Sequence, residues 1–166
     1  MNQILISLIQ LLKKLEELIE QYRKMNNRTK LYEAAVSFLG ADASPRDLAD
    51  DELGCAESVN EIHKKVFGTY ISPQNILSTY RMYEALTTDP RFVKVDKPQE
   101  GTIVISPTGY SSKGAKNGHV GICGKNDIIM SSDSRSGLWL ENYTIRSWES
   151  YYVVKLGFPI HYFNRL

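Results

Sequence analysis

The spacing of the apolar residues changes at Asp89-Pro90, and this change limits the possible folds more than any other feature. Before it, apolar side chains recur every three or four residues, which is the period of a helix. After it they alternate in short β-branched runs separated by Gly, Pro, Ser and Asn, as in strands joined by hairpin turns. The sequence therefore predicts an α+β fold, with helices first and an antiparallel sheet second.

Residues 3–25 carry a heptad repeat and predict one amphipathic helix. Its apolar positions are Leu5, Leu8, Leu12, Leu15, Ile19 and Tyr22. We expect this stripe to pack on the core of the same chain or on another copy, which would make a homo-oligomer; a partner helix or a membrane surface are the alternatives. Asn26-Asn27 predicts a break, so residues 1–27 form an appendage and residues 28–166 a single domain.

The remaining elements follow from caps, turns and periodicity. A short helix is expected to end at Gly40, a helical turn to occupy residues 45–49, a helix to start at Cys55, and another to run from Ser72 to Leu86. The predicted strands cover residues 102–106, 119–123, 127–131, 138–141, 151–155 and 160–163.

Charge and the N-terminal residues exclude several classes of function. The 20 basic and 19 acidic side chains nearly cancel, so nothing indicates nucleic acid as a partner. The apolar run at residues 4–9 is shorter than the about 20 residues that span a bilayer, so no transmembrane segment is expected. It also lacks the basic start and the cleavage site of a signal peptide, so we expect synthesis in the cytoplasm, with Cys55 and Cys123 as free thiols.

Cys55 and His119 are the residues whose local sequence best suits nucleophilic catalysis. A helix start favours the thiolate form of cysteine, and a nearby imidazolium favours it further. His63 lies eight residues after Cys55 on the same predicted helix, about 12 Å along the axis, and is expected at the surface. His161 lies on the last predicted strand, whereas His119 follows the tight turn Asn117-Gly118 and begins a strand that would hold its ring at the edge of the sheet.

A Gly-Cys pair at a helix start, followed by a strand that begins Gly-His-Val-Gly-Ile and then by a strand with polar residues, resembles the papain-like superfamily. Within it, residues 44–166 are similar to the CHAP (cysteine, histidine-dependent amidohydrolase/peptidase) and NlpC-like cell-wall hydrolases. The resemblance implies a papain-like fold with Cys55 as nucleophile and His119 as general base. A third polar residue on the next strand would orient the imidazole; Asp133 is the first choice, and Ser132 and Ser131 are the alternatives. Asp133 could instead only build the turn that follows it.

The same resemblance implies the substrate and the place of action. The expected reaction is cleavage of an amide bond in bacterial peptidoglycan, by an enzyme like a phage endolysin or a released cell-wall hydrolase, without a metal or an organic cofactor. Lys113 and Lys116 in a basic loop, and Trp139, are expected to contact the substrate. Two alternatives remain open: a cell-wall-binding or assembly protein with an inactive papain-like domain, and a cysteine protease that acts on proteins.

Overall fold

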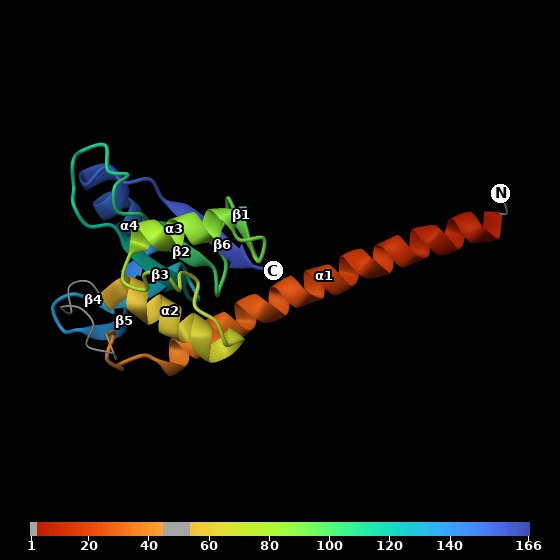
Figure 1. The fold of residues 1–166 in the computed structure, drawn as a ribbon, viewed down its shortest axis with the longest axis horizontal. Coiled ribbons are helices and arrows are strands. Elements are labelled where there is room, and N and C mark those ends of the chain that lie inside the picture. Colours follow the sequence, from red (N-terminus) through yellow and green to blue (C-terminus); the bar gives the residue numbers. More distant parts are fainter. Residues whose placement is uncertain (1–2, 45–53) are drawn as a thin grey trace.

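The computed structural model describes residues 3–44 and 54–166 and has an α+β fold (Figure 1). Its centre is a six-stranded antiparallel sheet with the strand order β1-β6-β2-β3-β4-β5. The helices are α1 (Gln3–Ser37), α2 (Gly54–Phe67), α3 (Thr79–Thr88), α4 (Ile145–Trp148) and the π-helix η2 (Glu149–Lys155). The strands are β1 (Phe92–Val95), β2 (Ile103–Ser106), β3 (His119–Cys123), β4 (Ile128–Asp133), β5 (Leu138–Thr144) and β6 (His161–Arg165). The prediction of helices before an antiparallel sheet is therefore confirmed.

Alternate residues of the central strands enter two separate cores, one on each face of the sheet. Ile103, Ile105 and Ile122 point toward α2, α3 and the end of α1. Together with the buried residues of these helices they form the larger core. Val104 and Cys123 are sequence neighbours of these isoleucines and point to the opposite face of the sheet. There they pack with the aromatic side chains of α4 and η2. Because both faces are covered, the central strands β2 and β3 are almost entirely buried.

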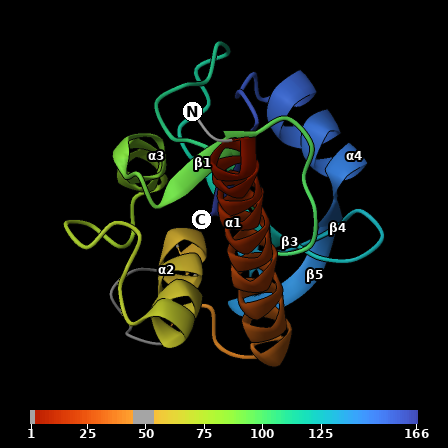
Figure 2. The ribbon, with the colours of Figure 1, turned by 90° about the vertical axis from the view of Figure 1, so that its right-hand side faces the viewer.

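Helix α1 is one continuous element, and most of it stands away from the domain (Figures 1 and 2). The predicted break at Asn26-Asn27 is wrong: no Gly or Pro lies between residues 3 and 37, so two asparagines cost the helix only their modest propensity. Leu31 and Ala35 are its buried residues, and the heptad stripe of residues 3–25 is exposed. The expectation that the stripe packs on the chain's own core is therefore wrong for the described residues.

The structure differs from the sequence prediction at three further places. Helix α3 begins at Thr79 rather than at Ser72, because Ser78 is the N-cap and accepts a hydrogen bond from the Arg81 N–H at 3.2 Å. Residues 149–155 form a π-helix and not a strand, although the run Tyr-Tyr-Val-Val has high β propensity. Strand β1 was not predicted. The helical turn expected at residues 45–49 lies outside the described residues.

Asn60, on α2, holds the irregular segment 71–76 in place. Its Oδ1 accepts hydrogen bonds from the N–H groups of Ile71 and Ser72, at 2.9 and 3.1 Å. Its Nδ2 donates to the carbonyl of Ile76 at 3.0 Å, to the carbonyl of Ala56 and to the Ser72 hydroxyl. The side chain is fully buried, and these five hydrogen bonds use its whole amide group.

Asn60→Ala is expected to lower the free energy of unfolding by about 3 kcal/mol, because the buried N–H groups of Ile71 and Ser72 lose their acceptor. Urea unfolding followed by tryptophan fluorescence measures the change. Asn75→Ala is the matched control: Asn75 lies in the same segment, is exposed, and accepts one hydrogen bond from the Leu77 N–H. It should cost less than about 1 kcal/mol. Equal losses in the two variants would contradict the assignment.

Candidate functional site

Cys55 lies in the first turn of α2, where its sulfur meets the start of β3. Burial raises the pKa of the thiol to about 11, while hydrogen bonds from the backbone N–H groups of Val120, Ala56 and Cys55 itself lower it. Val120 directly follows His119, so the sulfur lies beside the strand end that carries the imidazole. The prediction of a thiol at a helix start is confirmed.

His119 is held at the edge of the sheet by the loop before it. The Gly118 N–H donates to the Thr108 hydroxyl at 2.9 Å, and a Cβ at residue 118 would lie 2.1 Å from the carbonyl oxygen of Ser106, so the loop needs glycine there. That loop is tied to the start of α3, because the Thr108 N–H donates to the Thr79 hydroxyl at 3.1 Å. The position of His119 therefore depends on the contacts of Thr108 and Gly118 in the loop that precedes β3.

Aromatic side chains from β5, α4 and η2 enclose the His119 ring. Trp148 and Tyr152 stack on it, with ring centroids 5.1 and 5.3 Å away, and Tyr143 meets it edge-on. Trp148 is anchored by its indole N–H, which donates to the Ser106 hydroxyl at 3.0 Å. Burial lowers the pKa of His119 to about 4, and the negative charge of Asp133 acts in the opposite direction. The imidazole is therefore neutral at pH 7.

A chain of hydrogen bonds fixes which nitrogen of His119 carries the proton. The Ser131 hydroxyl donates to Asn142 Oδ1 at 2.7 Å, and His119 Nε2 lies 3.0 Å from the same hydroxyl. A hydroxyl has one proton to donate, so Ser131 must accept from His119 and Nε2 must carry the hydrogen. Nδ1 is then the unprotonated nitrogen and can act as a base.

Asn142 owes its position to a β-bulge. Across β4 and β5, Ile129 pairs with Tyr143 and Met130 with Glu141, so Asn142 is the extra residue between them. Bulges re-aim side chains, and they occur often beside active sites. Here the bulge turns the Asn142 amide toward Ser131, and its Nδ2 donates to the Ser132 carbonyl at 3.3 Å. The sequence analysis did not single out Asn142, because no local signal marks a bulge in this strand.

Asp133 builds the turn after β4 and does not hydrogen-bond His119. Its Oδ1 accepts from the N–H groups of Arg135 and Ser136, at 3.0 and 2.9 Å, and from the Ser136 hydroxyl; these bonds lower the pKa of Asp133. The structure thus places Ser131, and not the first choice Asp133, against the imidazole. Asp133 acts on His119 only through its charge.

Tyr152 connects the two sides of the site. Its ring stacks on His119, and its hydroxyl lies 3.4 Å from that of Tyr143. Burial raises the pKa of Tyr152, with smaller contributions from Tyr143 and from the charge of Cys55. Tyr152 therefore packs against the imidazole, and the charge of Cys55 affects its pKa, although the sequence analysis gave it no role in catalysis.

A cavity of about 540 Å³ opens beside His119. It is lined by Asn117, Gly118, His119, Ser132, Asp133, Ser134, Arg135, Asn142, Tyr143, Tyr151, Tyr152 and Leu156. This lining combines tyrosine rings with an acidic and a basic side chain, so the cavity suits a polar ligand that carries charge.

None of the three predicted substrate contacts lines this cavity. Trp139 is fully buried and its indole N–H donates to the Ala35 carbonyl at 3.0 Å, so the prediction that it contacts substrate is wrong. The Lys113 ammonium donates to the Val154 carbonyl at the end of η2, and Lys116 is exposed. Arg135 is the basic side chain that the structure puts beside His119 instead.

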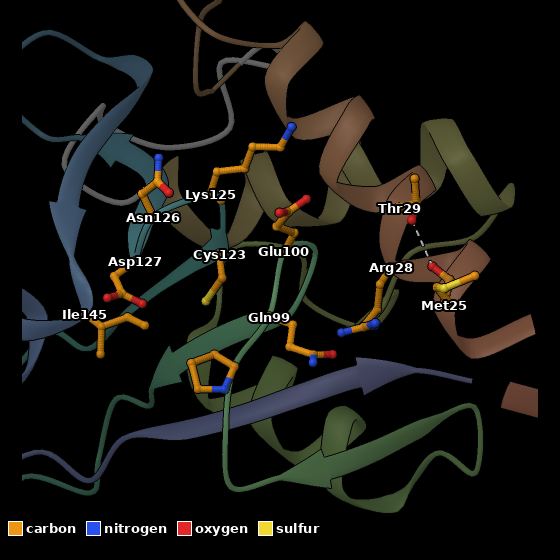
Figure 3. A pocket seen from close by; sticks show the side chains of 12 residues that line it. Met25, Arg28, Thr29, Gln99, Glu100, Cys123, Lys125, Asn126, Asp127 and Ile145 are labelled. Carbon is orange, nitrogen blue, oxygen red and sulfur yellow. Dashed lines mark hydrogen bonds between the residues drawn. The ribbon is translucent and has the colours of Figure 1, made fainter. Parts of the chain in front are cut away.

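A second cavity of about 480 Å³ lies at the base of α1 and shares no lining residue with the first (Figure 3). Arg28 enters it from α1, Glu100 from the loop before β2, and Asp127 from the turn after β3. It also contains a thiol, Cys123, which is buried and whose pKa is raised to about 12 by that burial. His119 lines the first cavity, whereas the buried Cys55 lines neither of the two.

The other two histidines lie away from Cys55. His63 is fully buried, contrary to the expectation of a surface residue, and its Nδ1 lies 2.6 Å from the Thr69 carbonyl. His161 stacks on Tyr83. Within residues 3–44 and 54–166, no three His, Cys, Asp or Glu side chains come together as metal ligands would.

Comparisons of the chain with protein-family models, with curated proteins and with solved structures found no match.

We predict that acid destabilises the fold through His63 and His119. Burial lowers the pKa of each to about 4, from 6.5, so the unfolded chain takes up protons first as the pH falls. The contribution is complete above about pH 6.5 and is lost between about pH 6.5 and 4, by at most about 3 kcal/mol for each histidine. Urea unfolding at several pH values measures the slope. His63→Gln should flatten it, and an unchanged slope would refute the assignment.

Proposed function

We propose that this chain is a cysteine hydrolase with a papain-like fold that cleaves an amide bond in bacterial peptidoglycan, either between muramic acid and L-alanine or within the peptide stem or cross-bridge. One observation carries the proposal: the Cys55 thiol, at the start of α2, lies close enough to the backbone N–H of Val120, the residue after His119, for that group to lower its pKa. A thiol and an imidazole with a free base nitrogen are thus held at one end of the sheet.

The arrangement of elements supports the papain-like assignment. A helix that opens with the nucleophile packs on an antiparallel sheet, and the general base begins a central strand. The polar residue that orients the base comes from the next strand, β4, as the resemblance of residues 44–166 implies, and it is Ser131, one of the two alternatives to Asp133.

The reaction begins with proton transfer from the Cys55 thiol to His119 Nδ1 as the sulfur attacks the amide carbonyl. The new C–S bond gives a tetrahedral oxyanion, which the Cys55 N–H at the helix start stabilises. Nδ1–H then protonates the leaving amine, the C–N bond breaks, and a thioester remains. Water, deprotonated by the same nitrogen, attacks the thioester and releases the acid and the free thiol.

Burial decides the resting protonation state. The pKa of Cys55 is raised and that of His119 is lowered, so the neutral thiol and neutral imidazole dominate at pH 7. The thiol therefore attacks with general-base assistance from His119, and not as a preformed thiolate. The N–H groups of Val120, Ala56 and Cys55 stabilise the negative charge once it forms on sulfur.

The cavity beside His119 supports a peptidoglycan substrate. Arg135 and Asp133 offer opposite charges to the carboxylates and amines of a stem peptide, and the exposed Tyr151 offers a ring face to a sugar or an aliphatic side chain. Both classes of group occur next to each other in peptidoglycan.

The decisive experiment is clearing of purified sacculi from several bacterial types, followed by mass spectrometry of the released fragments. Wild type should clear them, and Cys55→Ala should lose at least about 10³-fold in rate. Cys123→Ala is the matched control, since Cys123 is also a buried free thiol but lines the second cavity and not the one beside His119; it should retain activity.

Two outcomes would contradict the proposal. If Cys55→Ala clears sacculi as fast as wild type does, Cys55 is not the nucleophile. Tight binding to sacculi without clearing by either protein would instead indicate a cell-wall-binding protein, and cleavage of denatured protein but not of sacculi would indicate a protease.

Ser131→Ala should lower kcat by about 10²-fold with little change in KM, because His119 loses the hydrogen bond that fixes its tautomer. Asp133→Asn should change kcat less than about 3-fold, since an amide oxygen can still accept the hydrogen bonds of the turn. The pH dependence of kcat should shift in Ser131→Ala only. If Asp133→Asn loses as much activity as Ser131→Ala, Asp133 is the residue that orients His119.

A further inference from the structure

The projecting part of α1 carries a wide apolar face that no described part of the chain covers. Ten large apolar side chains recur there at spacings that repeat every seven residues, and they are between 44% and 67% exposed. They are Ile4, Leu5, Leu8, Leu11, Leu12, Leu15, Leu18, Ile19, Tyr22 and Met25. Three apolar positions in each heptad make a face wide enough for a helical bundle.

The chain's own domain cannot reach this face. At about 100° per residue, Leu8 and Ala35 lie about 180° apart around the helix, and Leu15 and Leu31 about 160° apart. Leu31 and Ala35 are the residues that α1 buries in the domain. Since α1 runs unbroken from Gln3 to Ser37, the apolar face points away from the domain, and nothing within residues 3–44 and 54–166 covers it.

We propose that α1 joins copies of this chain into a parallel helical bundle through this face, with the domains on its outside at one end. The ten half-exposed side chains offer roughly 800 Å² of apolar surface on each helix, which matches the about 800 Å² per partner of a stable interface. A second copy also brings the same heptad period, so the two faces stay in contact along the about 35 Å of helix.

The charges of α1 favour a second copy over a lipid surface. Helices that lie on membranes carry mainly Lys and Arg on their polar face. Here the polar face has both signs: Lys13, Lys14, Arg23 and Lys24 against Glu16, Glu17 and Glu20, with Glu20 and Lys24 paired at 3.7 Å. No helix among the described residues is long and apolar enough to cross a bilayer.

Near the middle of the apolar face, its two edges carry side chains of opposite charge. Lys14 borders it on one side and Glu16 on the other, because two residues turn the helix by about 200°. In a parallel bundle one edge of each helix faces the opposite edge of its neighbour, so Lys14 meets Glu16 of the next copy at nearly the same height. An antiparallel pair would instead place like edges together.

The test is the mass of the full chain by sedimentation equilibrium over about 1 to 100 μM. Wild type should form a discrete oligomer of the 18.9 kDa chain, and Leu15→Glu should be monomeric. Lys14→Glu and Glu16→Lys should each weaken association at least about tenfold, and the double variant should restore it, since the two edges again carry opposite charges. All three substitutions are on the exposed part of α1, so the domain should stay folded in each variant.

A wild-type chain that stays monomeric at the highest concentration overturns the proposal. Vesicles with and without anionic lipid then identify a membrane surface: Glu16→Lys would strengthen binding to anionic vesicles and Lys14→Glu would weaken it, whereas a bundle is weakened by both. A double variant as dissociated as the single ones would overturn the parallel arrangement.

Discussion

The contact between the first turns of α2 and the start of β3 is the constraint on which the rest of the structure depends. Residues 54–60 are all buried, so the polar groups of this helix start need partners inside the protein. The Ser58 hydroxyl donates to the Ala43 carbonyl at 2.5 Å, and a Cβ at Gly54 would lie 2.2 Å from the Ser44 hydroxyl. The helix start is thereby fixed, and with it the sulfur of Cys55. The contact between α2 and β3 therefore belongs both to the large core and to the candidate site.

That burial sets the electrostatics of the site. A neutral thiol and a neutral imidazole are inexpensive to bury, whereas an ion pair at the same place needs donors for the thiolate and an acceptor for the imidazolium. The chain supplies the first through the backbone N–H groups around Cys55 and the second through the Ser131 hydroxyl, which Asn142 holds in place. Such groups stabilise charge that appears during a reaction without requiring it in the resting state, which is what the proposed general-base mechanism needs.

Local sequence predicted the elements whose period is regular and missed those set by tertiary contacts. The start of β3 at His119 and the helix start at Cys55 were predictable because a turn signal precedes a change of period. The bulge at Asn142 and the burial of Trp139 were not, since they depend on contacts with β4 and with α1. The run at residues 149–155 has high β propensity and predicted a strand, but it forms a π-helix. Asp133 shows the same limit: its spacing suits an orienting carboxylate, but its Oδ1 accepts hydrogen bonds from the turn that follows.

Helix α1 is a stiff connection between the domain and the exposed apolar face, because one continuous helix is part of both. A Cβ at Gly101 would lie 2.0 Å from the Arg28 carbonyl, and the Ala35 carbonyl accepts the Trp139 indole N–H, so the last turns of α1 are built into the domain. The helix then continues without a Gly or Pro into the exposed apolar face. A continuous helix transmits orientation where a Gly- and Ser-rich linker would lose it. Whatever holds the apolar face therefore also sets the direction in which the Cys55 and His119 site faces.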